Sequence, residues 1–269
     1  FSCFDHYDKD SQLYGYMTSY SKNRMNCEQE VIDQLLEMLK KDKFQDDEYF
    51  SAIQNARLIK NAEQYYRNMF SGKVSSWNLR DQHMVETISN IDKFLANKLK
   101  SPAKLIIWAH NSHIGDARFT QQGRGGEHNV GQLMRKLYPG ETFLLGFTTF
   151  DGNVTAASEW GASAECKKVN KALSESVENL FHKVDIPKFY LITKDHPEVI
   201  AALPVHSLER AIGVVYLPET ERQSHYFYVD VANQFDAIIH IDKTSAVQPI
   251  ENISIPKDRD VPETYPSGM

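Results

Sequence analysis

The chain has 269 residues, of which 41% are hydrophobic and 25% are charged, a composition typical of a globular protein with an ample core. Its 30 basic and 36 acidic residues give a net charge of −6 with no basic block, which argues against nucleic acid and anionic membranes as partners. No apolar run approaches the ~20 residues needed to span a bilayer. Cys3, Cys27 and Cys166 are scattered and lack metal-binding spacing, which favours a reducing compartment and predicts a cytoplasmic protein.

The first hundred residues carry the apolar spacing of amphipathic helices. Within residues 27–40, the apolar positions form a stripe one helix face wide. Residues 52–69 place apolar side chains at spacings of three and four, and residues 78–99 repeat this pattern. We therefore expect a helical subdomain over residues 1–100.

From residue 104 onward, short apolar runs alternate with helical segments. Alternation of this kind predicts an α/β fold with a mostly parallel sheet and flanking helices over residues 101–250. Residues 251–269 are rich in proline and charge and are expected to form a surface tail. The expected strands are residues 105–109, 142–149, 189–193, 211–217 and 237–241, and the expected helices are residues 129–137, with Asn129 as N-cap, and residues 174–182.

Polar residues follow directly behind the first expected strand. The apolar run 105–109 ends in His110, Asn111, Ser112 and His113. In open α/β sheets the carboxyl ends of strands are where ligands bind, and histidine is suited to proton transfer near neutral pH. The two histidines are therefore a candidate site, the alternative being a turn whose histidines only hydrogen-bond the loop.

Metal binding is a third interpretation of this segment. His110, His113 and Asp116 could ligate a metal ion. The spacing lacks the glutamate of the HExxH motif, however, and the segment is expected to end a strand and not to lie in a helix. We expect no metal and no cofactor.

Arg80 is a second candidate because it continues the apolar stripe of the third helix. A partly buried guanidinium either pairs with a carboxylate, such as that of Asp81, or faces a substrate anion. His83 lies beside Arg80 on the same helix and could belong to the same pocket. We predict that Arg80, His110 and His113 converge on one cleft.

Two further segments contain candidate carboxylates. The glycine-rich loop 122–129 precedes a helix and could hold an anion, but it lacks the spacing of a nucleotide-binding motif, which favours a mobile flap or an ordinary flexible loop. Its carboxylate, Glu127, could orient a histidine. Residues 219–226 form a second polar cluster that includes Glu219. This cluster could border the cleft or be a charge-paired loop.

Several strings in this chain resemble the erythromycin esterase family. They are SWNLRDQHM at residues 76–84, WAHNSHIGDAR at 108–118 and GEHNVGQL at 126–133. The resemblance continues in order through residues 145–147, 176–182 and 213–219 and ends at residues 242–244. It is closest to the broad branch of erythromycin esterase homologues and not to the antibiotic-resistance enzymes themselves.

The resemblance implies a hydrolase that opens a lactone or cleaves an ester, macrolide lactones being the substrates that give the family its name. In that scheme a histidine base oriented by a glutamate activates water, and cationic groups stabilise the oxyanion. Between the two histidines we favour His110, which is nearer the strand end. The residues carried over are His110, His113 and Arg80 as catalytic groups and His83, Asn111, Glu127 and Glu219 as substrate-binding groups.

The sequence departs from the family at its start. The family's principal base lies in an N-terminal GE-x-x-HG motif, which this sequence lacks, and Phe1 enters the family pattern partway along. We therefore expect a C-terminal fragment with little activity when isolated. The alternatives are a non-catalytic protein that binds a small molecule and a metal-dependent hydrolase built on His110 and His113.

Overall fold

The computed structural model describes residues 2–8, 10–20, 26–40, 46–70 and 73–248. The predicted tail, residues 251–269, lies outside the described residues. The chain divides into two compact units, Phe1–Trp108 and Ala109–Met269, here called the helical unit and the mixed unit. No helix among the described residues is both long enough and apolar enough to cross a membrane.

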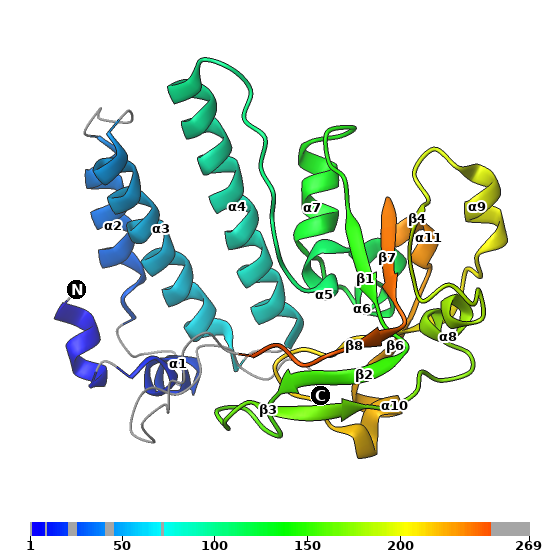
Figure 1. Cartoon of the computed structure of the whole chain (residues 1–269). Coiled ribbons are helices and arrows are strands. Elements are labelled where there is room, and N and C mark those ends of the chain that lie inside the picture. Colours follow the sequence, from blue (N-terminus) through cyan, green and yellow to red (C-terminus); the bar gives the residue numbers. More distant parts are fainter. Residues whose placement is uncertain (1, 9, 21–25, 41–45, 71–72, 249–269) are drawn as a thin grey trace. The chain divides into compact units, whose positions relative to one another are not determined.

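The helical unit is arranged around one long central helix. This helix, α3, contacts α1, α2 and α4 (Figure 1). The Asp46 carboxylate caps it by accepting hydrogen bonds from the backbone N–H groups of Glu48 and Tyr49. The three helices predicted from apolar spacing are confirmed. The elements are η1 (Ser2–Tyr7), α1 (Ser11–Tyr20), α2 (Glu28–Leu39), α3 (Asp47–Asn68) and α4 (Lys73–Leu99).

A disulfide joins Cys3 to Cys27, whose Cα atoms are 5.8 Å apart. Both cysteines are buried and pack with Tyr7 and Tyr14 in one apolar cluster. The sequence did not predict this disulfide, because the spacing of two cysteines along a chain does not show whether they meet in space. The cysteine pattern consequently no longer supports a reducing compartment.

Loss of this disulfide should destabilise the helical unit. The bond closes a loop of 24 residues, and a cross-link of this kind typically contributes about 2–4 kcal/mol by restricting the unfolded chain. We expect the double variant Cys3→Ser/Cys27→Ser to unfold at a lower urea concentration than the wild type. The exposed Cys166 supplies the matched control, Cys166→Ser. Equal midpoints for the double variant and the wild type would contradict this prediction.

The mixed unit combines short helices with three small sheets (Figure 1). Its strands are β1 (Leu145–Thr148), β2 (Asp151–Ala156), β3 (Glu165–Val169), β4 (Lys188–Ile192), β5 (Ser207–Arg210), β6 (Tyr226–Val229), β7 (Ala237–Ile241) and β8 (Lys243–Thr244). Its helices are α5 (Asn111–Ile114), η2 (Ala117–Phe119), α6 (Gln121–Arg124), α7 (Val130–Leu137), α8 (Val177–His182), α9 (Pro197–Ala202), η3 (Pro218–Thr220), α10 (Glu221–Ser224) and α11 (Val231–Gln234).

The sheets mix parallel and antiparallel pairing. β7 pairs with β1 in parallel and with β4 in antiparallel orientation. β2 pairs with β3 in antiparallel and with β8 in parallel orientation, and β5 and β6 are antiparallel. The fold is mixed α/β, but the expectation of a mostly parallel sheet is not confirmed. Side chains of α8, β6, α11 and β7 form the main core, including Val177, Phe181, Val229, Phe235 and Ile238.

Three of the five expected strands form, as β1, β4 and β7, and two do not. Residues 105–109 pair with none of the described strands, and Ile106 and Trp108 are 94% and 86% exposed. An apolar run becomes a strand only where a neighbouring strand accepts its backbone hydrogen bonds. Residues 211–217 form only an isolated bridge at Val215, and the strand of this region, β5, lies just before them.

Candidate functional site

The two histidines of the HNxH string lie in a tight turn around α5. His110 is the N-cap of α5, and its Nδ1 accepts a hydrogen bond from the Ser112 backbone N–H at 3.2 Å. The Ser112 hydroxyl lies 2.9 Å from the same nitrogen. Burial lowers the pKa of His110, and the neighbouring His113 lowers it further, against a hydrogen bond to the Ile212 backbone that raises it. The pKa of His110 therefore lies below its ordinary value, and its Nδ1 is bonded within the turn to Ser112.

Asn111 attaches this turn to the sheet. Its Nδ2 donates to the Phe147 carbonyl at 2.8 Å, and its Oδ1 accepts from the Phe147 backbone N–H at 3.1 Å. Phe147 lies on β1, so a side-chain amide takes the place of a neighbouring strand at this point. The second hydrogen of Nδ2 goes to Glu209 Oε1 at 3.0 Å. Asn111 thus joins the histidine turn, strand β1 and a buried carboxyl group.

Asn129 holds the other side of the turn and begins α7. Its Nδ2 donates to the Ser112 carbonyl at 2.8 Å, and its Oδ1 accepts from the Gln132 backbone N–H, which confirms the predicted N-cap. α7 approaches so closely that a Cβ at Gly131 would lie 2.1 Å from the Ile114 carbonyl oxygen. Only glycine fits at this contact. The backbone of the turn is therefore fixed from both sides.

Asp116, at the end of the turn, is fully buried and forms ion pairs with two arginines. Its carboxylate accepts hydrogen bonds from Arg118 at 2.6 Å and from Arg135 at 3.1 Å. These hydrogen bonds lower the pKa of Asp116 despite its burial. Because two guanidinium groups occupy this carboxylate, the metal-site interpretation loses its third ligand. Within the described part of the chain, no three His, Cys, Asp or Glu side chains are grouped to hold a metal ion.

Two fully buried glutamates lie behind the turn. Burial and, to a smaller extent, the charge of nearby Glu178 together raise the pKa of Glu209 to about 8. Burial also raises the pKa of Glu178. Next to Glu209 in β5, the guanidinium of Arg210 donates to Glu221 at 3.1 Å. It also donates to the backbone carbonyls of Thr149, Phe150 and Asn170.

The second polar cluster is largely internal. Glu221 is buried and accepts hydrogen bonds from Arg210 and from the Tyr216 hydroxyl at 2.7 Å. Nε2 of His225 accepts from the Leu217 backbone N–H at 2.9 Å. Glu219 itself is exposed in η3. The ion pair of Glu221 with Arg210 fits the charge-paired interpretation of this cluster, whereas Glu219 is exposed.

The remaining candidates lie in the loop after α6 and in the helical unit. Glu127 is partly buried in that loop. Arg80 lies on α4 with its guanidinium 4.9 Å from the centre of the Trp77 ring, and its buried Nε has no hydrogen-bond partner. His83 Nδ1 lies 2.8 Å from Asn61 Nδ2, and burial lowers the pKa of His83. Arg80 and the histidine turn belong to different units, so their convergence stays a prediction.

Sequence reasoning missed Glu178, Glu209 and Arg210. A usable signal existed for two of them, because Glu209 and Arg210 interrupt an apolar stretch between Leu208 and Ala211. Charged residues inside an apolar run are buried only if they are paired or neutral.

Solved structures with similar folds belong to chains that are longer than this one. A succinoglycan biosynthesis protein superimposes with a TM-score of 0.60 at 18% identity, covering 91% of this chain and 57% of its own. A protein from Bacillus cereus gives a TM-score of 0.65 at 16% identity, with coverages of 90% and 56%. A mutant of erythromycin esterase EreC in its open conformation gives 0.52 at 14% identity, with coverages of 79% and 51%. The chain thus spans little more than half the length of these structures.

The sequence itself matches the family model described as erythromycin esterase over residues 1–244. This match includes the histidine turn, Arg80 and the buried carboxyl pair. The chain belongs to the erythromycin esterase family.

Proposed function

We propose that this chain forms part of a hydrolase that cleaves an ester or a lactone, with the histidine turn supplying the proton-transfer group. The observation that carries the proposal is the attachment of that turn, through Asn111 to β1 and through Asn129 to α7. Catalytic groups act efficiently when neighbouring contacts fix their geometry before substrate arrives. Family membership supports the same reaction class.

We assign different roles to the two histidines. Because His110 uses Nδ1 to cap α5 and is also bonded to the Ile212 backbone, it positions the turn. His113, three residues further along the same turn, then takes a proton from water. The resulting hydroxide attacks the acyl carbon, the bond to the alkoxy oxygen breaks, and the proton passes to the leaving alkoxide. The sequence alone favoured His110 for this step.

Asparagine substitutions separate these two roles. Asparagine is among the best N-cap residues, so His110→Asn should keep the turn and most of the activity. His113→Asn should lower kcat/KM by about 10²–10⁴-fold, the usual contribution of a general base. The assay uses the natural protein that contains this sequence, with p-nitrophenyl esters, simple lactones and a macrolide as substrates. The reverse pattern would assign proton transfer to His110, and ligand binding without turnover would identify a non-catalytic binding protein.

Arg80 is proposed to stabilise the oxyanion. Its buried, unpartnered Nε and its stacking on Trp77 leave the guanidinium suited to a substrate anion. Removing one such donor typically lowers kcat by about 10²–10³-fold. We therefore expect Arg80→Gln to lower kcat in the same assay, while the neighbouring exposed substitution Gln82→Ala has little effect. An unchanged kcat in Arg80→Gln would remove Arg80 from the site.

A further inference from the structure

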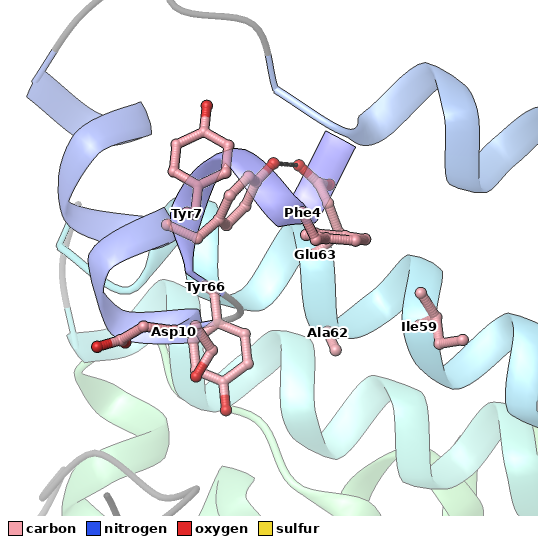
Figure 2. A pocket seen from close by; sticks show the side chains of 9 residues that line it. Phe4, Tyr7, Asp10, Ile59, Ala62, Glu63 and Tyr66 are labelled. Carbon is pink, nitrogen blue, oxygen red and sulfur yellow. Dashed lines mark hydrogen bonds between the residues drawn. The ribbon is translucent and has the colours of Figure 1, made fainter. Parts of the chain in front are cut away.

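Both carboxylates that line the pocket of about 210 Å³ in the helical unit are used by the fold itself. Asp10 caps the start of α1 by accepting two backbone N–H groups. Glu63 accepts hydrogen bonds from Tyr14 and Arg67 (Figure 2). The pocket is therefore part of the core of that unit. A row of unpartnered backbone groups lies instead in the mixed unit.

The unpartnered groups belong to β4, which is an edge strand of the sheet β1–β7–β4. In an antiparallel pair, alternate residues of one strand bond to the other. The Thr193 N–H, directly after β4, donates to the Asp236 carbonyl at 2.9 Å, so the odd-numbered residues of β4 are the ones that bond to β7. The backbone groups of the other residues point away from β7, and among the described residues none accepts from them or donates to them. These residues are Lys188, Tyr190 and Ile192.

The side chains along this edge are mainly apolar and exposed. Phe189 and Leu191 pack against the main core, so the side chains of the alternate residues lie on the opposite face of the sheet. Tyr190 is 72% exposed and Ile192 is 40% exposed. Within β4 only Lys188, its first residue, is charged. An edge strand with free backbone groups and exposed apolar side chains is a template for another strand.

A second copy of β4 fits this edge in one antiparallel register. If Tyr190 of one copy lies opposite Tyr190 of the other, Lys188 of each copy lies opposite Ile192 of the other. All the residues that face outward then form hydrogen-bonded pairs, and no lysine lies opposite a lysine. A register centred on Lys188 would place two ammonium groups opposite each other, which is unfavourable. The charge at this edge therefore selects the register centred on Tyr190.

We propose that two copies of this chain associate through β4, as an antiparallel pair centred on Tyr190. The three-stranded sheet of each copy then becomes half of one continuous sheet. Such a contact is two-fold symmetric, because each copy offers the same residues to the other. The proposal rests on the edge of the sheet and not on the proposed hydrolase activity.

Sedimentation equilibrium of the natural protein that contains this sequence tests the proposal, at concentrations from about 1 to 200 µM. We expect a reversible dimer. Ile192→Lys places a lysine opposite Lys188 of the other copy and should raise the dissociation constant about tenfold or more. Ile192→Glu places a carboxylate there and should dimerise at least about fivefold more tightly than Ile192→Lys. Val205→Lys, at a residue that is 71% exposed outside this edge, should leave the dimer unchanged.

A wild type that stays monomeric over this range, as it would if another segment of the natural protein covered β4, would overturn the proposal. Equal dissociation constants for Ile192→Lys and Ile192→Glu would also overturn it. Both comparisons are made on variants whose thermal unfolding shows that they are folded.

Cross-linking tests the register directly and needs neither of these variants. Opposite residues in a hydrogen-bonded antiparallel pair have Cα atoms about 5.5 Å apart, within the range of a disulfide. In a Cys166→Ser background, Tyr190→Cys should therefore form a disulfide-linked dimer under mild oxidation. Lys188→Cys is the matched control, because residues 188 of the two copies would be about 13 Å apart along the strands. Cross-linking of Lys188→Cys as fast as that of Tyr190→Cys would overturn the proposed register.

Discussion

Replacing Arg210 by methionine should be among the most destabilising single changes in the mixed unit, at about 3–5 kcal/mol. The side chain is 2% exposed and donates to the Glu221 carboxylate and to three backbone carbonyls. Methionine fills a similar volume but leaves the Glu221 charge buried, with the Tyr216 hydroxyl as its remaining hydrogen-bond partner in the described part of the chain. The expected result in scanning calorimetry is a melting temperature lowered by roughly 10 °C.

The double variant Arg210→Met/Glu221→Gln distinguishes lost pairing from lost packing. Removing both charges costs less than leaving one of them buried and unpaired, so the double variant should be more stable than Arg210→Met alone. The exposed Arg124 supplies the control Arg124→Met, which should melt within about 1 °C of the wild type. A double variant that is less stable than the single variant would show that the arginine acts through its carbonyl contacts alone.

The second large effect is on the pH dependence of stability. The pKa of Glu209 is about 8 in the folded chain, well above its ordinary value of 4.5. A carboxyl group whose pKa is raised by folding stabilises the fold fully at pH values below its pKa in the unfolded chain. This stabilisation is lost as the pH rises through the pKa of the group in the folded chain. At 1.36 kcal/mol per pH unit, the loss from pH 4.5 to pH 8 is roughly 3–5 kcal/mol. Glu209→Gln cannot ionise and should not show this loss.

The measurement is the difference in unfolding free energy between Glu209→Gln and the wild type from pH 5 to pH 8.5. Taking a difference removes the opposite contribution of the histidines whose pKa burial lowers, which gain stability as pH rises. These are His83, His110, His225 and His240. The stability of Glu209→Gln should increase relative to the wild type as pH rises. The exposed change Glu159→Gln should show no such trend, and a flat difference for Glu209→Gln would mean that Glu209 is already ionised in the folded chain.

Local patterns predicted the elements whose contacts are close in sequence. α2 follows from its apolar stripe, and the N-cap of α7 follows from Asn129. Strand β7 matches residues 237–241, because a short apolar run in the core suits a strand. The run 105–109 is also short and apolar, but it is not a strand, because pairing with a neighbouring strand decides whether such a run becomes one.

The sequence around His110 and His113 predicted the position of the turn, but it did not predict the hydrogen bonds that attach the turn to the rest of the fold. Asn111 bonds to Phe147 and to Glu209, which lie 36 and 98 positions further along the chain. Spacing carries no information on contacts of this range. The same holds for the disulfide between Cys3 and Cys27 and for the carbonyls around Arg210.

The hydrogen bonds of Asn111 also determine which side chains position 111 can accept. Both amide hydrogens go to acceptors, the Phe147 carbonyl and Glu209, while the amide oxygen receives the Phe147 N–H. Aspartate has the same shape but no hydrogen to give, and its charge would face both acceptors. Glutamine has the right groups on a side chain one methylene too long for both bonds to Phe147. Slow deamidation of this one side chain, a change of a single mass unit, would therefore release the histidine turn from its sheet.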